Sequence, residues 1–171
     1  MIENLILLLI AILTVLFMGL LWLRYSLLHS LAIARQHEQI LQSDFDRRRD
    51  MVPYLLEGAR ELGDPSDTWR KLVEDRSTFH ALSDQMNVQR ELDFEVTLNS
   101  YLQSTALRGV HFLDAKKDIE ELSAIIEKEK LSLRDAVQAF NEERKAFPYT
   151  LASAIFGFKV LGEAEFEPLK R

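Results

Sequence analysis

The hydrophobic and polar positions divide the chain into an apolar opening stretch and a longer amphipathic remainder. Residues Leu5 to Leu23 include no charged side chain, and Thr14 is the only polar one among them. This length of roughly 19 residues is close to the 20 or so that a helix needs to span a bilayer. The pattern predicts a membrane anchor at residues 1–23, followed by a helical part that is polar enough to live in water.

Two other interpretations of the apolar stretch fit less well. A cleaved signal peptide has a basic start, an apolar core of about 7–15 residues and small residues at its cleavage site. Here the only charge before the stretch is Glu3, and the small pair Ala32 and Ala34 lies well beyond Arg24. A buried core helix would need apolar partners on every side, which the rest of the chain does not supply.

Positive charge follows the anchor and does not precede it. The arginines after it are Arg24, Arg35, Arg47, Arg48 and Arg49. Such an excess places the arginine-rich side in the cytoplasm, and Trp22 and Tyr25 lie where an aromatic belt would meet that interface. We expect a single-pass membrane protein with a short N-terminus outside and a cytoplasmic C-terminal domain.

Apolar residues at helical spacing continue after the anchor and predict further helices. The first helix should run on to Gly63, with a local kink at Pro53, and residues 63–67 should form a turn. A second helix is expected to begin near Ser66 or Asp67, and whether residues 68–107 form one helix or two stays open.

The last long helix follows a break expected at residues 108–111, with Asp114 as its N-cap, and should end before Pro148. Its apolar positions recur by threes and fours, as in a coiled coil or a helical bundle. The apolar segment 149–158 should pack back on the bundle, closed by Gly157 and Gly162. The expected architecture is all-α: an anchor that continues into an antiparallel bundle of about four helices (residues 24–158), then a tail (residues 159–171).

Composition removes several classes of function. The chain has no cysteine, which excludes disulfides and thiolate metal sites. Its net charge of −6 argues against a general nucleic-acid binder. The arginines near the membrane are still suited to anionic headgroups, at about 1 kcal/mol each when close to the surface.

A search for catalytic or metal-binding patterns returns no site residues. None of the histidines has a glutamate three residues before it, as a di-iron bundle would require; they are His29, His37, His80 and His111. No nucleophile elbow and no glycine-rich phosphate loop occurs. The acidic run of Glu120, Glu121, Glu127 and Glu129 is typical of a solvated helix face. The sequence predicts a non-enzymatic protein without a catalytic residue, a cofactor, a metal or a small-molecule substrate.

Two polar residues lie beside the predicted apolar stripes. Arg48 falls between Phe45 and Val52, and Asn141 follows Phe140. We interpret them as a buried hydrogen-bonded pair that sets helix register, with a ligand-binding role as the alternative.

Residues 47–56, Arg-Arg-Arg-Asp-Met-Val-Pro-Tyr-Leu-Leu, resemble the Arg-Arg-x-Asp-Leu-Ile-Pro-Asn-Leu-Val segment of the LemA family. Residues 136–141 are similar to its Val-x-x-Tyr-Asn motif, and residues 147–166 to its closing Phe-Pro, Gly-Phe and Phe pattern. The chain departs from the family at Tyr54 and at Leu133-Arg134, where the family has Asn and a first Tyr-Asn pair. The resemblance implies a divergent bacterial member: an N-terminally anchored helical bundle facing the cytoplasm, without an established enzymatic role.

The main hypothesis is a membrane-anchored scaffold or interaction module that contacts the lipid bilayer and binds partner proteins or itself. Its proposed docking face comprises Phe94, Val96 and Tyr101. One alternative is a membrane-tethered sensor with a ligand pocket between its helices, for which Pro53 would act as a hinge. Another is an accessory subunit of a membrane enzyme.

Overall fold

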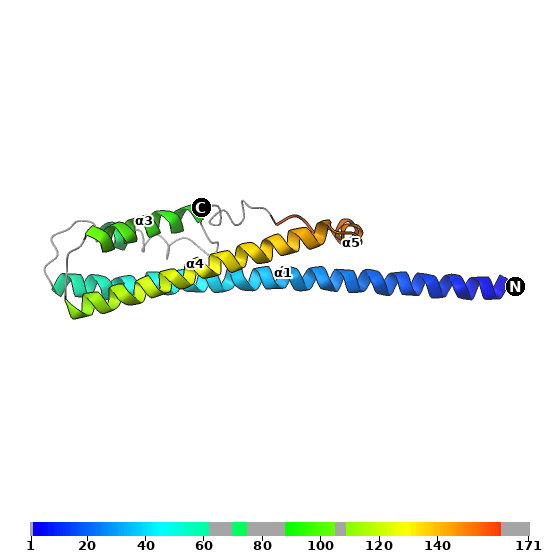
Figure 1. Ribbon diagram of the computed structural model, residues 1–171, viewed down its shortest axis with the longest axis horizontal. Coiled ribbons are helices and arrows are strands. Elements are labelled where there is room, and N and C mark those ends of the chain that lie inside the picture. The colour runs from blue at the N-terminus through cyan, green and yellow to red at the C-terminus, as the bar shows by residue number, and fades with distance from the viewer. Residues whose placement is uncertain (1, 62–69, 75–87, 105–108, 162–171) are drawn as a thin grey trace. The chain divides into compact units, whose positions relative to one another are not determined.

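The computed structural model describes residues 2–61, 70–74, 88–104 and 109–161, and most of these residues are helical. The named helices are α1 (Ile2–Glu61), α3 (Val88–Ser104), α4 (Val110–Lys145) and α5 (Tyr149–Phe156), and residues 70–74 are also helical (Figure 1). No strand occurs among these described residues. The predicted all-α class is therefore confirmed.

The long first helix is continuous, as the apolar periodicity predicts. α1 runs from Ile2 to Glu61 and contains Pro53 without ending there. Pro53 removes one hydrogen bond within α1, and it lies on an exposed face, where water can reach the carbonyl that loses its donor. The turn predicted at residues 63–67 lies outside the described residues, and the choice between one helix and two over 68–107 depends on residues that also lie outside them.

The N-cap prediction at Asp114 is wrong, because α4 already begins at Val110. The Leu113 amide donates to the Gly109 carbonyl at 2.9 Å, which adds one turn before Asp114. Phe112 in that turn is buried in the core, and its burial outweighs the modest gain from a cap. The break predicted at 108–111 is also wrong for its last two residues. The end of α4 at Lys145, before Pro148, agrees with expectation.

The chain divides into two compact units. The first unit comprises Met1–His37 with Leu133–Glu165. Its core contains buried residues of α1, α4 and α5, and half-buried apolar residues pack against it: Leu23, Leu27, Phe140 and Ala152, then Leu31, Tyr149, Phe156, Phe158 and Leu161. Segment 149–158 therefore packs back on the helices, as predicted. Gly157 ends α5 in the left-handed conformation at φ 71°, which glycine adopts without strain.

The second unit comprises Glu38–Ser132 with Phe166–Arg171. Its core joins α1, residues 70–74, α3 and α4: Val52, Leu55, Ala59, Leu72, Phe94, Leu98, Tyr101, Leu102, Phe112, Ala115 and Ile119. Within this unit α1 and α4 run antiparallel, because Phe45 lies near Lys130 whereas Gly58 lies against Phe112. A Cβ at Gly58 would lie 2.8 Å from the Phe112 nitrogen, so the two helix backbones approach closely there.

Candidate functional site

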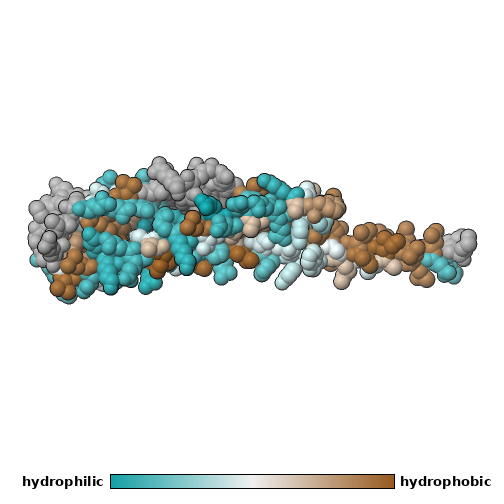
Figure 2. Space-filling view, in the orientation of Figure 1, coloured by the Kyte–Doolittle hydropathy of each residue, from teal (hydrophilic) through white to brown (hydrophobic). Residues whose placement is uncertain are grey.

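The opening part of α1 carries a continuous apolar surface that no described residue covers. Every large apolar side chain from Leu5 to Met18 is at least half exposed, from 51% at Ile6 to 71% at Val15. Figure 2 shows this end of α1 as an uninterrupted hydrophobic surface. The Thr14 hydroxyl donates to the Ile10 carbonyl at 2.8 Å, so its polar group is satisfied within the helix. Water-soluble proteins rarely expose so large an apolar area.

Protein packing begins where the apolar segment ends. Leu23 and Leu27 are the first buried side chains along α1. Among the described helices, α1 is the one with a stretch long and apolar enough to cross a membrane. By length and composition alone, a membrane span and a signal sequence near the N-terminus meet this description equally well.

Polar contacts hold the first unit together just beyond this boundary. The hydroxyls of Ser26 and Ser30, one helical turn apart on α1, both donate to the Glu143 carboxylate of α4, the first at 2.6 Å. The Asn141 amide donates to the Leu161 carbonyl at 3.0 Å and accepts from the Leu161 amide at 3.1 Å. The carbonyl of Phe158 accepts from Arg144 at 3.0 Å. These bonds connect α1 to α4 and attach the chain after α5.

The second unit contains a group of charged side chains from α1, α3 and α4, most of them buried or nearly so, whereas Glu127 is exposed. We call this group the Arg48 cluster; its members are Arg48, Arg49, Glu91, Glu95, Glu127 and Lys130. Glu95 accepts from Lys130 at 3.3 Å and lies 3.8 Å from Arg48. Lys130 also donates to Glu127 at 2.6 Å, and Arg49 pairs with Glu91. The cluster therefore ties three helices together by ion pairs.

Arg48 is the most deeply buried member, at 1% exposure. Its guanidinium carbon lies 5.4 Å from the Phe45 ring centre and 6.0 Å from that of Phe94, within range of cation–π attraction. Burial lowers the pKa of Arg48, and the charge of Glu95 partly offsets this effect. Its Nε and Nη2 atoms have no hydrogen-bond partner among the described residues. A buried arginine in this setting is held mainly by one carboxylate and by aromatic faces.

Arg48 and Asn141, which were expected to form a hydrogen-bonded pair, contact different residues. Arg48 is buried, as predicted, but in the second unit, and the Asn141 amide bonds with the backbone of Leu161 in the first unit. Sequence reasoning missed Glu91 and Glu95. Their four-residue spacing, interleaved with Phe94 and Leu98, places them beside the apolar face of α3, and this is the signal that would have found them.

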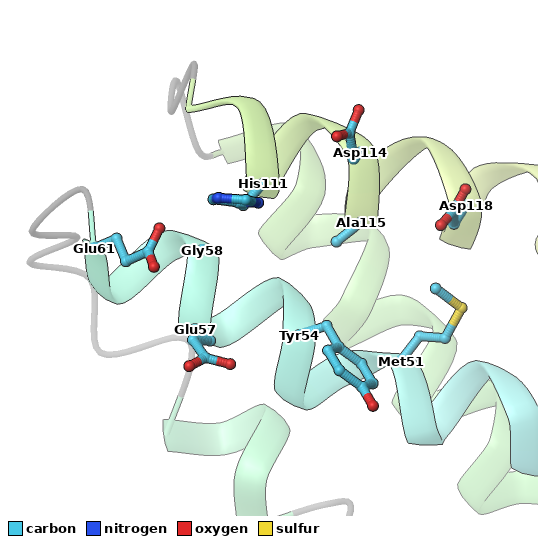
Figure 3. A pocket seen from close by; sticks show the side chains of 9 residues that line it. All are labelled: Met51, Tyr54, Glu57, Gly58, Glu61, His111, Asp114, Ala115 and Asp118. Carbon is cyan, nitrogen blue, oxygen red and sulfur yellow. The ribbon is translucent and has the colours of Figure 1, made fainter.

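A shallow groove of about 500 Å³ lies between α1 and α4 in the second unit. Its lining includes Tyr54, Glu57, His111 and Asp114 (Figure 3). The carboxyl groups of Glu57 and Asp114 point to opposite sides, away from the space between the helices. Polar groups that bind a small molecule converge on it, and these two carboxyl groups do not.

The histidines and acids give no metal site in the part of the chain that the structure describes. No group of three or more metal-ligating side chains forms there; His80 lies outside the described residues. Compared with protein-family models, with curated proteins and with solved structures, the chain matches none.

Proposed function

We propose that this protein is a membrane-anchored helical scaffold, in which α1 crosses a bilayer between Leu5 and Leu23 and the remaining helices lie in the cytoplasm. The exposed apolar surface of α1 is the observation that carries the proposal. At about 1.5 Å per residue this segment is close to the 30 Å thickness of the hydrocarbon core. The helical part would bind partner proteins or further copies of itself.

Membership of a divergent branch of the LemA type is part of this proposal. The motif residues that carry the resemblance make structural contacts in this protein. Arg48 is buried among helices of the second unit, whereas Asn141 and Phe158 hold the end of the first unit. Residues that pack and hold helices together suit a scaffold, because a binding module needs a rigid frame and no reactive group.

The docking face expected on α3 is wrong in two of its three residues. Phe94 and Tyr101 are fully buried in the second core, and only Val96 is exposed, at 67%. Apolar side chains that are exposed on α4 offer surface for a partner instead, including Val110 and Leu113. The sensor alternative requires convergent polar groups around a ligand, and the Glu57 and Asp114 carboxyl groups point away from the groove. Accessory-subunit status remains a form of the scaffold proposal.

Membrane fractionation tests the anchor. The full-length protein should stay in the membrane pellet after alkaline carbonate washing and leave it only in detergent. Arginine at Leu9 and Leu13 should release the protein, because each arginine near the bilayer centre costs about 2.5–3.5 kcal/mol. Arginine at the exposed Ile125 and Leu131 adds the same charge to α4 and should leave the protein in the pellet. An intact mass that lacks the apolar segment would contradict the proposal and identify a signal sequence.

Cross-linking in the native membrane, followed by mass spectrometry, tests the scaffold role. A partner recovered in near-equal amount, or cross-links between copies of this chain, would support the proposal. Recovery of the monomer alone at every cross-linker length would contradict it.

A further inference from the structure

The segment around α5, residues 147–158, has more exposed apolar surface than its packing in the first unit requires. No charged residue occurs from Phe147 to Phe158, although the flanking residues Lys145 and Lys159 are charged and exposed. α5 itself has eight residues, from Tyr149 to Phe156.

Three large apolar side chains of this segment are exposed, whereas Tyr149, Phe156 and Phe158 are half-buried against the core of the first unit. Phe147, Leu151 and Ile155 are 82%, 55% and 61% exposed. The four-residue spacing of Leu151 and Ile155 puts these two on one side of α5, and Phe147 lies in the turn before it. The residues that α5 buries are the small Ala152 and Ser153. A helix that packs on a water-soluble core buries its large apolar residues and exposes polar ones. α5 instead fully buries only small residues and leaves Leu151 and Ile155, two of its large apolar residues, exposed.

The position of α5 in the first unit is defined by contacts with the end of the apolar segment of α1. The Trp22 and Tyr149 ring centres lie 6.5 Å apart, and the Arg24 guanidinium carbon lies 5.2 Å from the Phe156 ring centre. Ala152 shares its core with Leu23. These contacts place α5 beside the residues where α1 would leave the bilayer.

We propose that α5 lies in the headgroup region of the same bilayer as a second membrane contact, with Phe147, Leu151 and Ile155 inserted among the lipids. This inference rests on the proposed anchor. Short amphipathic segments bury their apolar face about 5–10 Å into the boundary between headgroups and acyl chains. Lys145 and Lys159, at the two ends of the apolar segment, then meet anionic headgroups.

The acidic residues close to α5 are engaged in hydrogen bonds within the protein. Glu143 accepts from Ser26 and Ser30, and Glu142 accepts from Gln138 at 2.8 Å. A lipid surface fits the exposed face of α5 better than a protein partner does. The contacts with Trp22 and Arg24 place α5 beside the end of the apolar segment of α1, where the bilayer would begin. Two contacts in one packed unit would also restrict the tilt of α1 in the bilayer.

A spin-label experiment on the full-length protein tests the inference. The chain has no cysteine, so Ile155→Cys can carry a single nitroxide in vesicles that contain anionic phospholipid. Oxygen concentrates in the bilayer and a nickel chelate stays in water. At residue 155 the ratio of oxygen to nickel accessibility should be at least about three times the ratio for a label at Ile125→Cys. This is the result expected for a side chain a few ångströms below the headgroups. Ile125 is a matched control, an isoleucine on α4 that is 51% exposed.

A third label at Phe17→Cys separates the two proposals. If the label at 17 is in lipid and the label at 155 matches the one at 125, α5 is in water: the second contact is overturned and the anchor stands. If the label at 17 is itself in water, the anchor fails. A label at 155 that neither reagent reaches indicates a protein contact and also overturns the lipid contact. Leu151→Cys repeats the test on the same face, should one variant fail to fold.

Discussion

At the scale of single residues, the surroundings of Arg48 predict unequal effects of three substitutions. Arg48→Ala should lower the free energy of unfolding by about 3 kcal/mol, because it leaves a cavity between the rings of Phe45 and Phe94. Arg48→Met should change it by less than about 1 kcal/mol, since methionine fills much of the space without a desolvated charge. Denaturant unfolding of the detergent-solubilised protein, followed by circular dichroism, measures both.

The third substitution removes the partner of Arg48. Glu95→Leu should cost about 3 kcal/mol or more, because a buried arginine then loses its nearest carboxylate. Lys130 is less affected, since it also pairs with Glu127. If Arg48→Met proves as damaging as Glu95→Leu, the guanidinium makes a net favourable contribution that this geometry does not explain.

Close helix packing gives a second prediction at this scale. Gly58→Ala should destabilise the protein by about 2 kcal/mol, because the new methyl group meets the backbone of Phe112 and the helices must move apart. Alanine favours a helix by up to about 1 kcal/mol, so the steric effect has to exceed that gain. Gly19→Ala, with no neighbouring atom within 4 Å, is the control. Thermal unfolding should give a lower midpoint for the Gly58 variant only.

At the scale of elements, Asn141 attaches the chain after α5 to α4. Asn141→Ala removes both bonds to Leu161, and amide hydrogen exchange at Leu161 should accelerate by roughly tenfold, for a loss of about 1.4 kcal/mol. Asn141→Asp keeps the acceptor and should have a smaller effect. Equal exchange in the wild-type protein and the alanine variant would show that the apolar contacts of Phe158 suffice.

Long elements with a strong apolar period were predictable, and their ends and faces were not. The extent of α1 and the end of α4 follow from composition and from Pro148. The start of α4 depended on burial of Phe112 against α1, a long-range contact that no local cap signal reports. Phe94 and Tyr101 were assigned to the surface for the same reason, since the face of α3 that is buried depends on its neighbours. The ion pairs of the Arg48 cluster escaped prediction because its acids come from α3 and α4. The spacing of Glu91 and Glu95 places them beside the apolar face of α3 but does not say which arginine they meet.

At the scale of the whole molecule, the distribution of charge around α1 predicts the orientation of the chain. Arg24 and Arg35 follow the apolar segment within the distance over which basic residues act, whereas Glu3 precedes it. A membrane-impermeant maleimide added to intact bacterial cells should label Glu3→Cys. Ile125→Cys should react only after the cells are permeabilised.

A charge exchange then tests whether these residues determine the orientation. Glu3→Lys with Asn4→Lys places basic residues before the anchor, and part of the population should invert, so that a cysteine at Ile125 becomes accessible from outside. Glu38→Lys with Gln39→Lys makes the same change in charge on the other side and should leave the orientation unchanged. Labelling at residue 125 in intact cells without any charge exchange would contradict the assignment. Because orientation depends on basic residues close to the anchor and little on acidic ones, the net charge of −6 does not oppose a cytoplasmic helical part.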